Sequence, residues 1–473
     1  MSKKKWLESD SERDLDPISS LLSEWSDPEE EEEEFRSDFF QGLSGRRRKA
    51  AFVLMAVWSI TIALYLVSWG FWVVLALTSL LSIQAIRFVI ACPESASVLL
   101  AEDSVGAPAV TLVVAAKNEA AVIGNLVKNL CHLDYPADRY EVWIVDDRST
   151  DETPKILDRL VQEYPQLQVL HRSAGASGGK SGALNQVLPL TKGEIVGVFD
   201  ADAQVPADIL RRVVPLFSEP EIGAVQARKA ITNAPENFWT LGQMAEMALD
   251  STIQQHRIAI GGIGELRGNG QFVRRTALER CGGWNEQTIT DDLDLTIRLH
   301  LDRWKIGFLE FPAVAEEGVT NAIALWHQRS RWAEGGYQRY LDYWRLIASN
   351  RMGFSKTLDL LSFMLLQYLL PTAAVPDLLM VVTRQRLSLL SPLSGLLLSL
   401  CCWAMFTGLR RTQRERLSFA TLVVIALQTL RGMVYMLHWL FVIASTTARL
   451  SVRPKRLKWV KTVHEGSSEE SFV

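Results

Sequence analysis

The feature that most constrains this chain of 473 residues is a stretch without a charged residue, Ala50–Ile86. One straight helix of that length would be about 55 Å long, whereas the hydrocarbon core of a bilayer is about 30 Å thick. Two spans that turn near residues 68–70 fit this thickness better. The stretch begins too late and is too long for a cleaved signal peptide. We therefore predict a transmembrane hairpin at residues 50–91.

Charged residues are strongly segregated along the chain, although the formal net charge is only -4. An acidic run at Asp27–Phe35 predicts that residues 1–45 form a disordered, solvated tail. Three basic clusters, at residues 45–50, Arg410–Arg416 and Arg453–Lys458, flank apolar stretches. Such clusters normally stay on the cytoplasmic side of a membrane and attract anionic lipids. We therefore expect an integral, multi-pass protein with membrane lipids, and no nucleic acid, as partners.

A C-terminal transmembrane region is predicted at residues 358–448, followed by a basic and then polar cytoplasmic tail at 449–473. Its last apolar stretch is long for one span and short for two, which leaves open a tilted span, a re-entrant segment or a pair. The basic clusters favour an even number of crossings but place Arg384 and Arg386 in an outer loop, so the sequence does not decide the number. The three apolar stretches are Leu360–Thr383, Leu387–Leu409 and Leu417–Ala448.

The segment between the two membrane regions, residues 105–332, has the composition of a water-soluble domain. A hairpin returns the chain to the side of its N-terminus, so we expect this domain to be cytoplasmic. Short strands rich in Val and Ile alternate with helical patterns, which predicts an α/β, Rossmann-like domain with a mostly parallel sheet. In such sheets, ligands bind beyond the carboxyl ends of the strands. The predicted strands are residues 109–116, 140–147, 167–172 and 193–202.

The next segment, residues 333–357, carries a stripe of aromatic and aliphatic residues at helical spacing, with Arg339 and Arg345 off the stripe. Tyr and Trp on an amphipathic helix suit a membrane interface, although packing into a protein core gives the same pattern. The neighbouring apolar stretches favour an interfacial helix. The stripe consists of Tyr337, Tyr340, Leu341, Trp344 and Ile347.

Pairs of aspartates end two of the predicted strands. Asp146 and Asp147 close the second strand, and Asp200 and Asp202 close the fourth, so both pairs should line one crevice. Two carboxylates one residue apart on an extended chain share a face, and their repulsion is a cost unless a cation or proton lies between them. Mg²⁺ takes one or two carboxylates together with substrate phosphates and water. Turn formation or helix capping is the simpler explanation of either pair alone.

The Gly-rich stretch Ser177–Gln186 adds a feature that favours anions. Gly178 and Gly179 allow the backbone to approach a ligand closely, and Lys180 at a helix start adds positive charge to the favourable end of the helix dipole. The spacing is not that of a Walker A loop, and a flexible surface loop is the alternative. Together with Asp200 and Asp202, however, this stretch is consistent with a site that binds a metal ion and a diphosphate.

Two later stretches carry further candidate groups. Asp291 and Asp292 begin a predicted amphipathic helix that Thr290 could cap. Acidic residues in a first turn are common, but a general base also requires a carboxylate within reach of the nucleophile's proton. The HQRSRW stretch offers a cation for a diphosphate leaving group and an indole face for stacking. Its candidate residues are Gln328, Arg331 and Trp332, and Glu119 after the first strand is a candidate for a nucleotide pocket.

Taken in order, these motifs resemble the membrane-bound inverting glycosyltransferases of family 2, which include the cellulose and hyaluronan synthases. The resemblance covers about Val110 to Trp332 and depends on VDDRS, the DAD pair, TDD, and QRSRW as a QxxRW motif. It implies a GT-A fold, a UDP-sugar donor and a divalent cation, Mg²⁺ with Mn²⁺ as the alternative. The chain departs from the family at Asp291, where Glu is usual, which puts acceptor contacts in doubt.

The resemblance also implies a role for each motif. Asp292 would be the catalytic base. Asp200 and Asp202 would serve the diphosphate and the metal, with Asp202 the more direct metal ligand. Glu119 and Asp147 would contact the uridine. The remaining donor-binding residues would be Lys180, Asp200, Gln328, Arg331 and Trp332.

The layout of acidic tail, hairpin and small C-terminal membrane region is similar, within that family, to the cyanobacterial enzymes that glucosylate diacylglycerol. This similarity implies UDP-glucose as donor and 1,2-diacylglycerol as acceptor. A processive polysaccharide synthase is the alternative: QxxRW favours it, whereas the few C-terminal spans leave little material for a polymer channel. A non-enzymatic membrane scaffold or transporter is a third reading, and the intact carboxylates argue against it. The motifs themselves indicate only a transferase site beside a bilayer.

Overall fold

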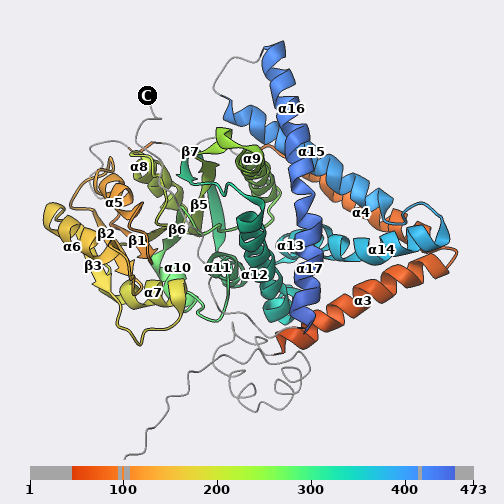
Figure 1. The fold of residues 1–473 in the computed structure, drawn as a ribbon, viewed down its shortest axis with the longest axis horizontal. Helices are drawn as coiled ribbons and strands as arrows, with labels where there is room; N and C mark the ends of the chain where they lie inside the picture. Colours follow the sequence, from red (N-terminus) through yellow and green to blue (C-terminus); the bar gives the residue numbers. More distant parts are fainter. Residues whose placement is uncertain (1–44, 94–98, 101–106, 414–417, 453–473) are drawn as a thin grey trace, which may run out of the picture.

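The computed structural model describes residues 45–93, 99–100, 107–413 and 418–452 (Figure 1). The predicted acidic tail lies almost wholly outside the described residues, as do most of the tail at 449–473 and part of the Arg410–Arg416 cluster. A sheet with covering helices forms one part of the molecule, and long apolar helices extend from one side of it (Figure 1).

A seven-stranded sheet lies at the centre of the first part, in the order β3-β2-β1-β4-β6-β5-β7. Strand β6 is antiparallel to both of its neighbours, and all other neighbouring strands are parallel. The prediction of a mostly parallel α/β sheet is confirmed, and the four predicted strands are β1 to β4. The strands are β1 (Val110–Ala116), β2 (Tyr140–Asp146), β3 (Leu167–His171), β4 (Ile195–Phe199), β5 (Ile222–Ile231), β6 (Gln271–Arg274) and β7 (Lys305–Glu316).

The register brings the ends of three strands to one edge of the sheet. Ala116 of β1 pairs with Asp146 of β2, and Val114 of β1 pairs with Phe199, the last residue of β4. Because these strands are parallel, their carboxyl ends meet at the edge where α/β proteins bind ligands. The motifs that follow β1, β2 and β4 are therefore brought together.

Helices cover both faces of the sheet, because its strands are apolar on both sides. Leu112 and Val114 pack against one layer and Val113 packs against the other, following the two-residue period of a strand. The first layer contains α5 (Ile123–Cys131), α6 (Thr153–Glu163) and α8 (Ile209–Val213), and the second contains α7 (Gly179–Val187), α10 (Arg275–Arg280) and α11 (Asp291–Leu301). Among the described residues, the short 3₁₀ helices are η2 (Leu188–Leu190), η3 (Val214–Ser218) and η4 (Ala234–Glu236).

Five helical segments within the described residues are long and apolar enough to cross a membrane. The first two, α3 and α4, flank the turn expected near residues 68–70. A Cβ on Gly70 would lie 1.9 Å from the Leu64 carbonyl oxygen, so this close approach requires glycine. The segments are α3 (Arg46–Leu66); α4 (Gly70–Ile90); α13 (Phe354–Met364) with the π-helical turn η5 (Leu365–Leu369) and α14 (Leu370–Arg384); α15 (Ser391–Thr412); and α16 (Phe419–Met436) with α17 (His438–Val452).

These helices do not all run in one direction. In Figure 1, α3, α4, α14 and α15 extend away from the sheet, whereas α16 and α17 follow one another across that direction. Helix α16 packs on α9 (Phe238–Ala259) and α15, and α17 packs on α3, α12 and α14. The last apolar stretch, which is long for one span and short for two, thus forms two consecutive helices, α16 and α17. They lie along the part of the molecule that contains the sheet.

Helix α12 (Ala322–Ala348) differs from the prediction. It begins before residue 333, so the QRSRW motif lies inside it. Four residues of the aromatic stripe are buried in a core shared with α11, α13 and α17, and only Trp344 is exposed. The prediction that this stripe faces a membrane interface is therefore wrong for those four, because α13 and α17 cover them. They are Tyr337, Tyr340, Leu341 and Ile347, and Arg339, expected off the stripe, is buried with them.

Candidate active site

The nine residues given a catalytic, donor-binding or metal-binding role line one cavity of about 960 Å³. This volume is near the top of the range of roughly 300–1,000 Å³ that small-molecule sites occupy. The cavity begins at the carboxyl ends of β1, β2 and β4 and continues along α9. Its predicted lining residues are Glu119, Asp147, Lys180, Asp200, Asp202, Asp292, Gln328, Arg331 and Trp332, and Asp291 lines it as well.

The two aspartates that end β2 have different surroundings. Asp147 lines the cavity, whereas Asp146 is not among the cavity-lining residues. One carboxylate oxygen of Asp146 accepts a hydrogen bond from the Ser149 backbone N–H at 3.0 Å, and the other lies 2.9 Å from Nδ1 of His171. The bond to Asp146 raises the pKa of the His171 imidazole. The expectation that both aspartates line the crevice is wrong for Asp146, whose side chain holds the following loop.

Asp147 is paired with Arg172, which belongs to none of the candidate motifs. Arg172 Nη1 donates to Asp147 Oδ1 at 2.8 Å, and both side chains are almost fully buried. The same guanidinium donates to the carbonyl oxygens of Ser177 and Gly179 at 2.5 and 3.2 Å. Arg172 therefore ties the end of β2 to the Gly-rich loop. The signal that could have revealed it is its position directly after β3, at the ligand-binding edge.

The Gly-rich loop presents Lys180 to the cavity. Gly178 and Gly179 have positive φ angles of 81° and 52°, a conformation that side chains disfavour, and α7 begins at the second of them. Lys180 Nζ donates to Asp200 Oδ1 at 2.6 Å. Burial alone would lower the pKa of Lys180, but the carboxylates of Asp200, Asp291 and Asp292 outweigh burial and raise it. Lys180 is consequently a fixed positive charge in the cavity.

Asp200 and Asp202 both line the cavity, as their spacing predicts. The Glu317 backbone N–H donates to Asp202 Oδ2 at 3.2 Å, and the Asp200 N–H donates to Asn269 Oδ1 at 3.3 Å. Within the described residues no group of three or more His, Cys, Asp or Glu side chains could hold a metal ion on its own. A pair of carboxylates nevertheless fits Mg²⁺ or Mn²⁺, because such ions commonly complete their coordination with substrate phosphates and water.

Asp291 and Asp292 begin α11 and lie in the cavity opposite Lys180. Burial, followed by the charge of Asp291, raises the pKa of Asp292 to about 6, and burial also raises the pKa of Asp291. Asp292 is thus a carboxylate at neutral pH that accepts a proton more readily than an exposed aspartate does. The expected cap is wrong: Thr290 occupies the N-cap position, but its side chain makes no capping hydrogen bond and packs against Gly335 of α12.

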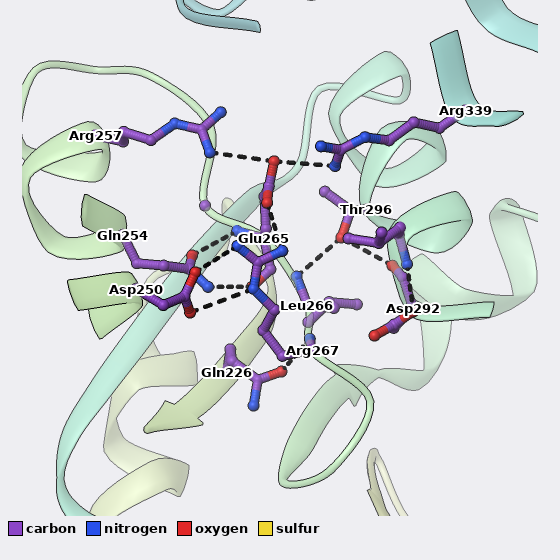
Figure 2. Close-up of polar contacts among 12 residues, drawn as sticks. Gln226, Asp250, Gln254, Arg257, Glu265, Leu266, Arg267, Asp292, Thr296 and Arg339 are labelled. Atoms are coloured by element: carbon purple, nitrogen blue, oxygen red, sulfur yellow. Dashed lines mark hydrogen bonds and ion pairs between the residues drawn. The ribbon is translucent and has the colours of Figure 1, made fainter. Parts of the chain in front are cut away.

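A buried polar network supports the turn of chain beside Asp292 (Figure 2). The Thr296 hydroxyl donates to the Asp292 carbonyl oxygen at 2.9 Å and accepts from the Leu266 N–H at the same distance. The next residue, Arg267, pairs with Asp250 at 2.6 Å. One turn of helix α11 is thereby bonded to the loop before β6.

Glu265 is the centre of that network and is fully buried. Its carboxylate lies within 3.1 Å of Arg257, 2.6 Å of Arg267 and 3.0 Å of Arg339, which belong to α9, the loop before β6 and α12. Burial would raise the pKa of Glu265, but the three guanidinium groups hold it well below its usual range. No sequence motif reveals this cluster, because its members are far apart along the chain.

The QRSRW motif places Trp332 against two cations. The guanidinium carbon of Arg329 lies 4.0 Å from the centre of the indole ring, and Lys229 Nζ lies 5.5 Å from it. Arg329 also donates to Glu246 of α9, which accepts from the hydroxyl of Tyr435. Arg329 therefore links the indole of Trp332 to α9 and, through Glu246, to Tyr435 of α16.

Arg331 and Gln328 lie in the same cavity on α12. Burial lowers the pKa of Arg331, and the charge of Asp200 opposes this effect. An arginine remains charged under all such shifts. Arg331 and Lys180 thus provide two cations near Asp200, which suits an anionic ligand.

Comparison with known proteins extends this picture. Residues 108–335 match the family model described as "Glycosyltransferase like family 2". The chain is 62% identical over 471 residues to the beta-monoglucosyldiacylglycerol synthase of Synechocystis sp., covering 99% of this chain and 98% of that protein. The protein of the same name from Nostoc sp. is 62% identical over 466 residues, which cover 98% of this chain and 99% of the relative.

Among solved structures, the chain is similar to the mannosyltransferase PcManGT from Pyrobaculum calidifontis, determined in complex with GDP-Man and Mn²⁺. The TM-score is 0.49 and the sequence identity is 23%, with 80% of this chain and 99% of that chain covered.

Proposed function

This chain belongs to the family-2 glycosyltransferases and, within them, to the group of the beta-monoglucosyldiacylglycerol synthases, and from that premise we propose that it transfers glucose from UDP-glucose to 1,2-diacylglycerol. The catalytic part is the GT-A-type α/β domain with its mostly parallel sheet. The observation that carries the proposal is a single cavity in which Asp292 faces Lys180, Asp200 and Asp202.

The proposed reaction is one displacement at the anomeric carbon. The primary hydroxyl of diacylglycerol gives its proton to the carboxylate of Asp292 while its oxygen attacks the sugar from the face opposite UDP. The bond between the anomeric carbon and the diphosphate oxygen breaks, and its electron pair leaves with UDP. Since only one displacement occurs, the configuration inverts and no glycosyl-enzyme intermediate forms.

Positive charge at the diphosphate supports departure of UDP. Lys180 and Arg331 lie near Asp200 in the cavity and would stabilise the charge that develops on the leaving group. Asp200 and Asp202 would hold Mg²⁺ or Mn²⁺, which supplies further charge neutralisation when bound. Asp202 is the more direct candidate ligand, because Asp200 is already paired with Lys180.

The remaining candidates would bind the donor. Glu119 and Asp147 follow β1 and β2 and would contact the uridine, with Arg172 positioning Asp147. Gln328 and Trp332 would close the pocket from α12. The indole of Trp332, which lies against the Arg329 guanidinium, offers an aromatic surface for stacking.

We also propose that the catalytic domain faces the cytoplasm. The basic residues 46–49 open α3, and Arg410 and Arg411 end α15, next to α9 of the catalytic domain. Basic residues at the ends of spans normally stay on the cytoplasmic side.

Product analysis tests the proposal. Purified protein in liposomes that contain diacylglycerol should convert UDP-glucose to UDP and a β-linked monoglucosyl lipid, identified by mass spectrometry and NMR. A panel of UDP-sugars tests donor choice in the same assay. A long glucan would instead support the processive synthase, which the full-length relatives do not favour. Absence of UDP release with every donor and lipid would support a non-enzymatic role.

A further inference from the structure

The cavity that holds Asp292 does not end at the polar residues. Along α9 it is lined from Glu246 to Arg257, a rise of about 17 Å at 1.5 Å per residue. Four of the five membrane-type segments contribute to its walls beyond the sheet; only α3 provides none of the described lining residues. One continuous space therefore joins the proposed transfer site to helices that are apolar enough for a bilayer.

The wall provided by these helices is mostly apolar. The described side chains of α4, α15, α16 and α17 that line the cavity carry no charge. They include Leu81, Phe88, Leu397, Leu398, Met433 and Leu440.

A second, more open cavity adjoins the first between α15 and α16. Leu398 of α15 and Met433 of α16 line both cavities. The other lining residues of the second cavity are Ser399, Cys402, Trp403 and Phe406 of α15. The two shared residues form a wall common to both cavities, so the outer cavity and the inner cavity are neighbours at this point.

Helices α15 and α16 pack closely on one another and on α9 beside these cavities. Gly432 of α16 lies so close to Met405 of α15 that a Cβ would come within 2.4 Å of the methionine sulfur. Gly408 of α15 is similarly tight against the Ala248 carbonyl oxygen of α9. In Figure 1, α15 extends away from the sheet, whereas α16 and α17 follow one another across that direction.

We propose that the acyl chains of the acceptor lipid enter sideways between α15 and α16, past Leu398 and Met433, and lie against the apolar wall while the hydroxyl reaches Asp292. This inference rests on the proposed function. The occupant follows from continuity: a molecule that must present a hydroxyl to Asp292 and keep its hydrocarbon out of water matches a cavity that is polar at one end and apolar at the other. A free sugar or a growing glucan would find few polar partners along α4, α15, α16 and α17, where Gln84 and Trp439 are the exceptions among the described lining residues.

Photolabelling tests where the lipid lies. The full-length protein in liposomes is irradiated with a diacylglycerol that carries a diazirine near the end of one acyl chain, and adducts are mapped by mass spectrometry. We expect adducts on the segments Leu397–Cys402 and Met433–Leu440, and their loss in the presence of excess unlabelled diacylglycerol. Adducts spread over the outward faces of α3 and α4, without competition, would overturn the inference.

Matched variants of α16 give a second readout. Met433→Trp places a larger side chain in the wall that the two cavities share. Val434→Trp is the control, because Val434 is 54% exposed and lines neither cavity. We expect Met433→Trp to lower kcat/KM for a dioleoyl acceptor by about tenfold relative to Val434→Trp, with a much smaller change for a dioctanoyl acceptor. Equal effects on both acceptors, or equal effects of both variants, would contradict the inference.

The two proposals fail in different ways. Labelling of the cavity without any glucosylation of the lipid would refute the proposed function and retain the lipid site. Glucosylation with adducts only on outward faces would retain the function and refute the lipid site.

Discussion

Lys180 Nζ donates a hydrogen bond to Asp200 Oδ1 at 2.6 Å, across the cavity edge formed by the start of α7 and the end of β4. The lysine therefore adds its charge to the positive end of the α7 dipole at the place where a diphosphate would lie. The pair also keeps one of the two candidate metal-binding carboxylates in a fixed position.

Removal of the Lys180 charge should weaken both donor binding and the departure of UDP. Lys180→Met should lower kcat/KM for UDP-glucose by about 10²–10³-fold, the range measured for loss of one stabilising donor. Lys180→Arg retains the charge and should recover part of the activity. UDP release measured with saturating lipid provides the test, and an unchanged rate in Lys180→Met would exclude this role.

Loss of the proposed base should affect catalysis far more than folding. Asp292→Asn keeps the shape of the side chain but cannot accept the proton, so kcat should fall by about 10²–10⁴-fold. The substrate affinities and the thermal unfolding temperature should change little. If the variant retained most of its activity with intact folding, Asp292 would not be the base.

The raised pKa of Asp292 predicts a specific pH dependence. Because the carboxylate form is the active form, kcat/KM should rise with pH through about 6 and level off above it. Asp291 raises the pKa of Asp292 by repulsion, so Asp291→Asn should shift this limb to lower pH. pH–rate profiles of the two proteins make the comparison. A limb that stays in place would mean that another group controls it.

The buried pair of Arg172 and Asp147 should be more important for stability than an exposed pair. Arg172→Met leaves the buried carboxylate of Asp147 with only the partly exposed Arg148, at 3.3 Å, and should lower the free energy of unfolding by about 3 kcal/mol. Adding Asp147→Asn removes that charge, so the double variant should be more stable than Arg172→Met alone. Thermal unfolding in detergent measures this difference, and donor titration should show a raised KM in each variant. Additive losses of stability would contradict direct coupling.

Activity should depend on a divalent cation that Asp202 helps to hold. A chelator should abolish UDP release, and Mg²⁺ or Mn²⁺ should restore it. Asp202→Asn should raise the cation concentration required for half-maximal activity more than Asp146→Asn does, since Asp146 is bonded to the following loop and does not line the cavity. Full turnover in the chelator, or equal requirements in both variants, would argue against this site.

Local patterns in the sequence were sufficient for β1 to β4 and for the residues at their ends, but not for β5, β6 and β7. Apolar runs with β-branched residues predict strands β1 to β4, and parallel pairing then requires that Asp147 and Asp200 meet at one edge. The motifs after these strands were visible because spacing along the chain determines which side chains share a face. The same reasoning located the uncharged hairpin and its glycine turn.

Contacts between distant segments decided the rest. Whether the stripe of α12 faces a membrane or a core depends on α13 and α17, which cover it, and not on its own periodicity. Arg172 became a part of the site only through Asp147, and Glu265 only through three arginines from separate elements.

The sequence by itself thus determined the first four strands, the segments that are apolar enough for a membrane and the positions of the carboxylates, because those properties depend on residues that are neighbours in the chain. Only the tertiary structure decided which charges neutralise one another and that the cavity extends to α15 and α16. The physical reason is that the cost of burying a charge, and the extent of a cavity, depend on groups that folding brings together from far apart in the chain.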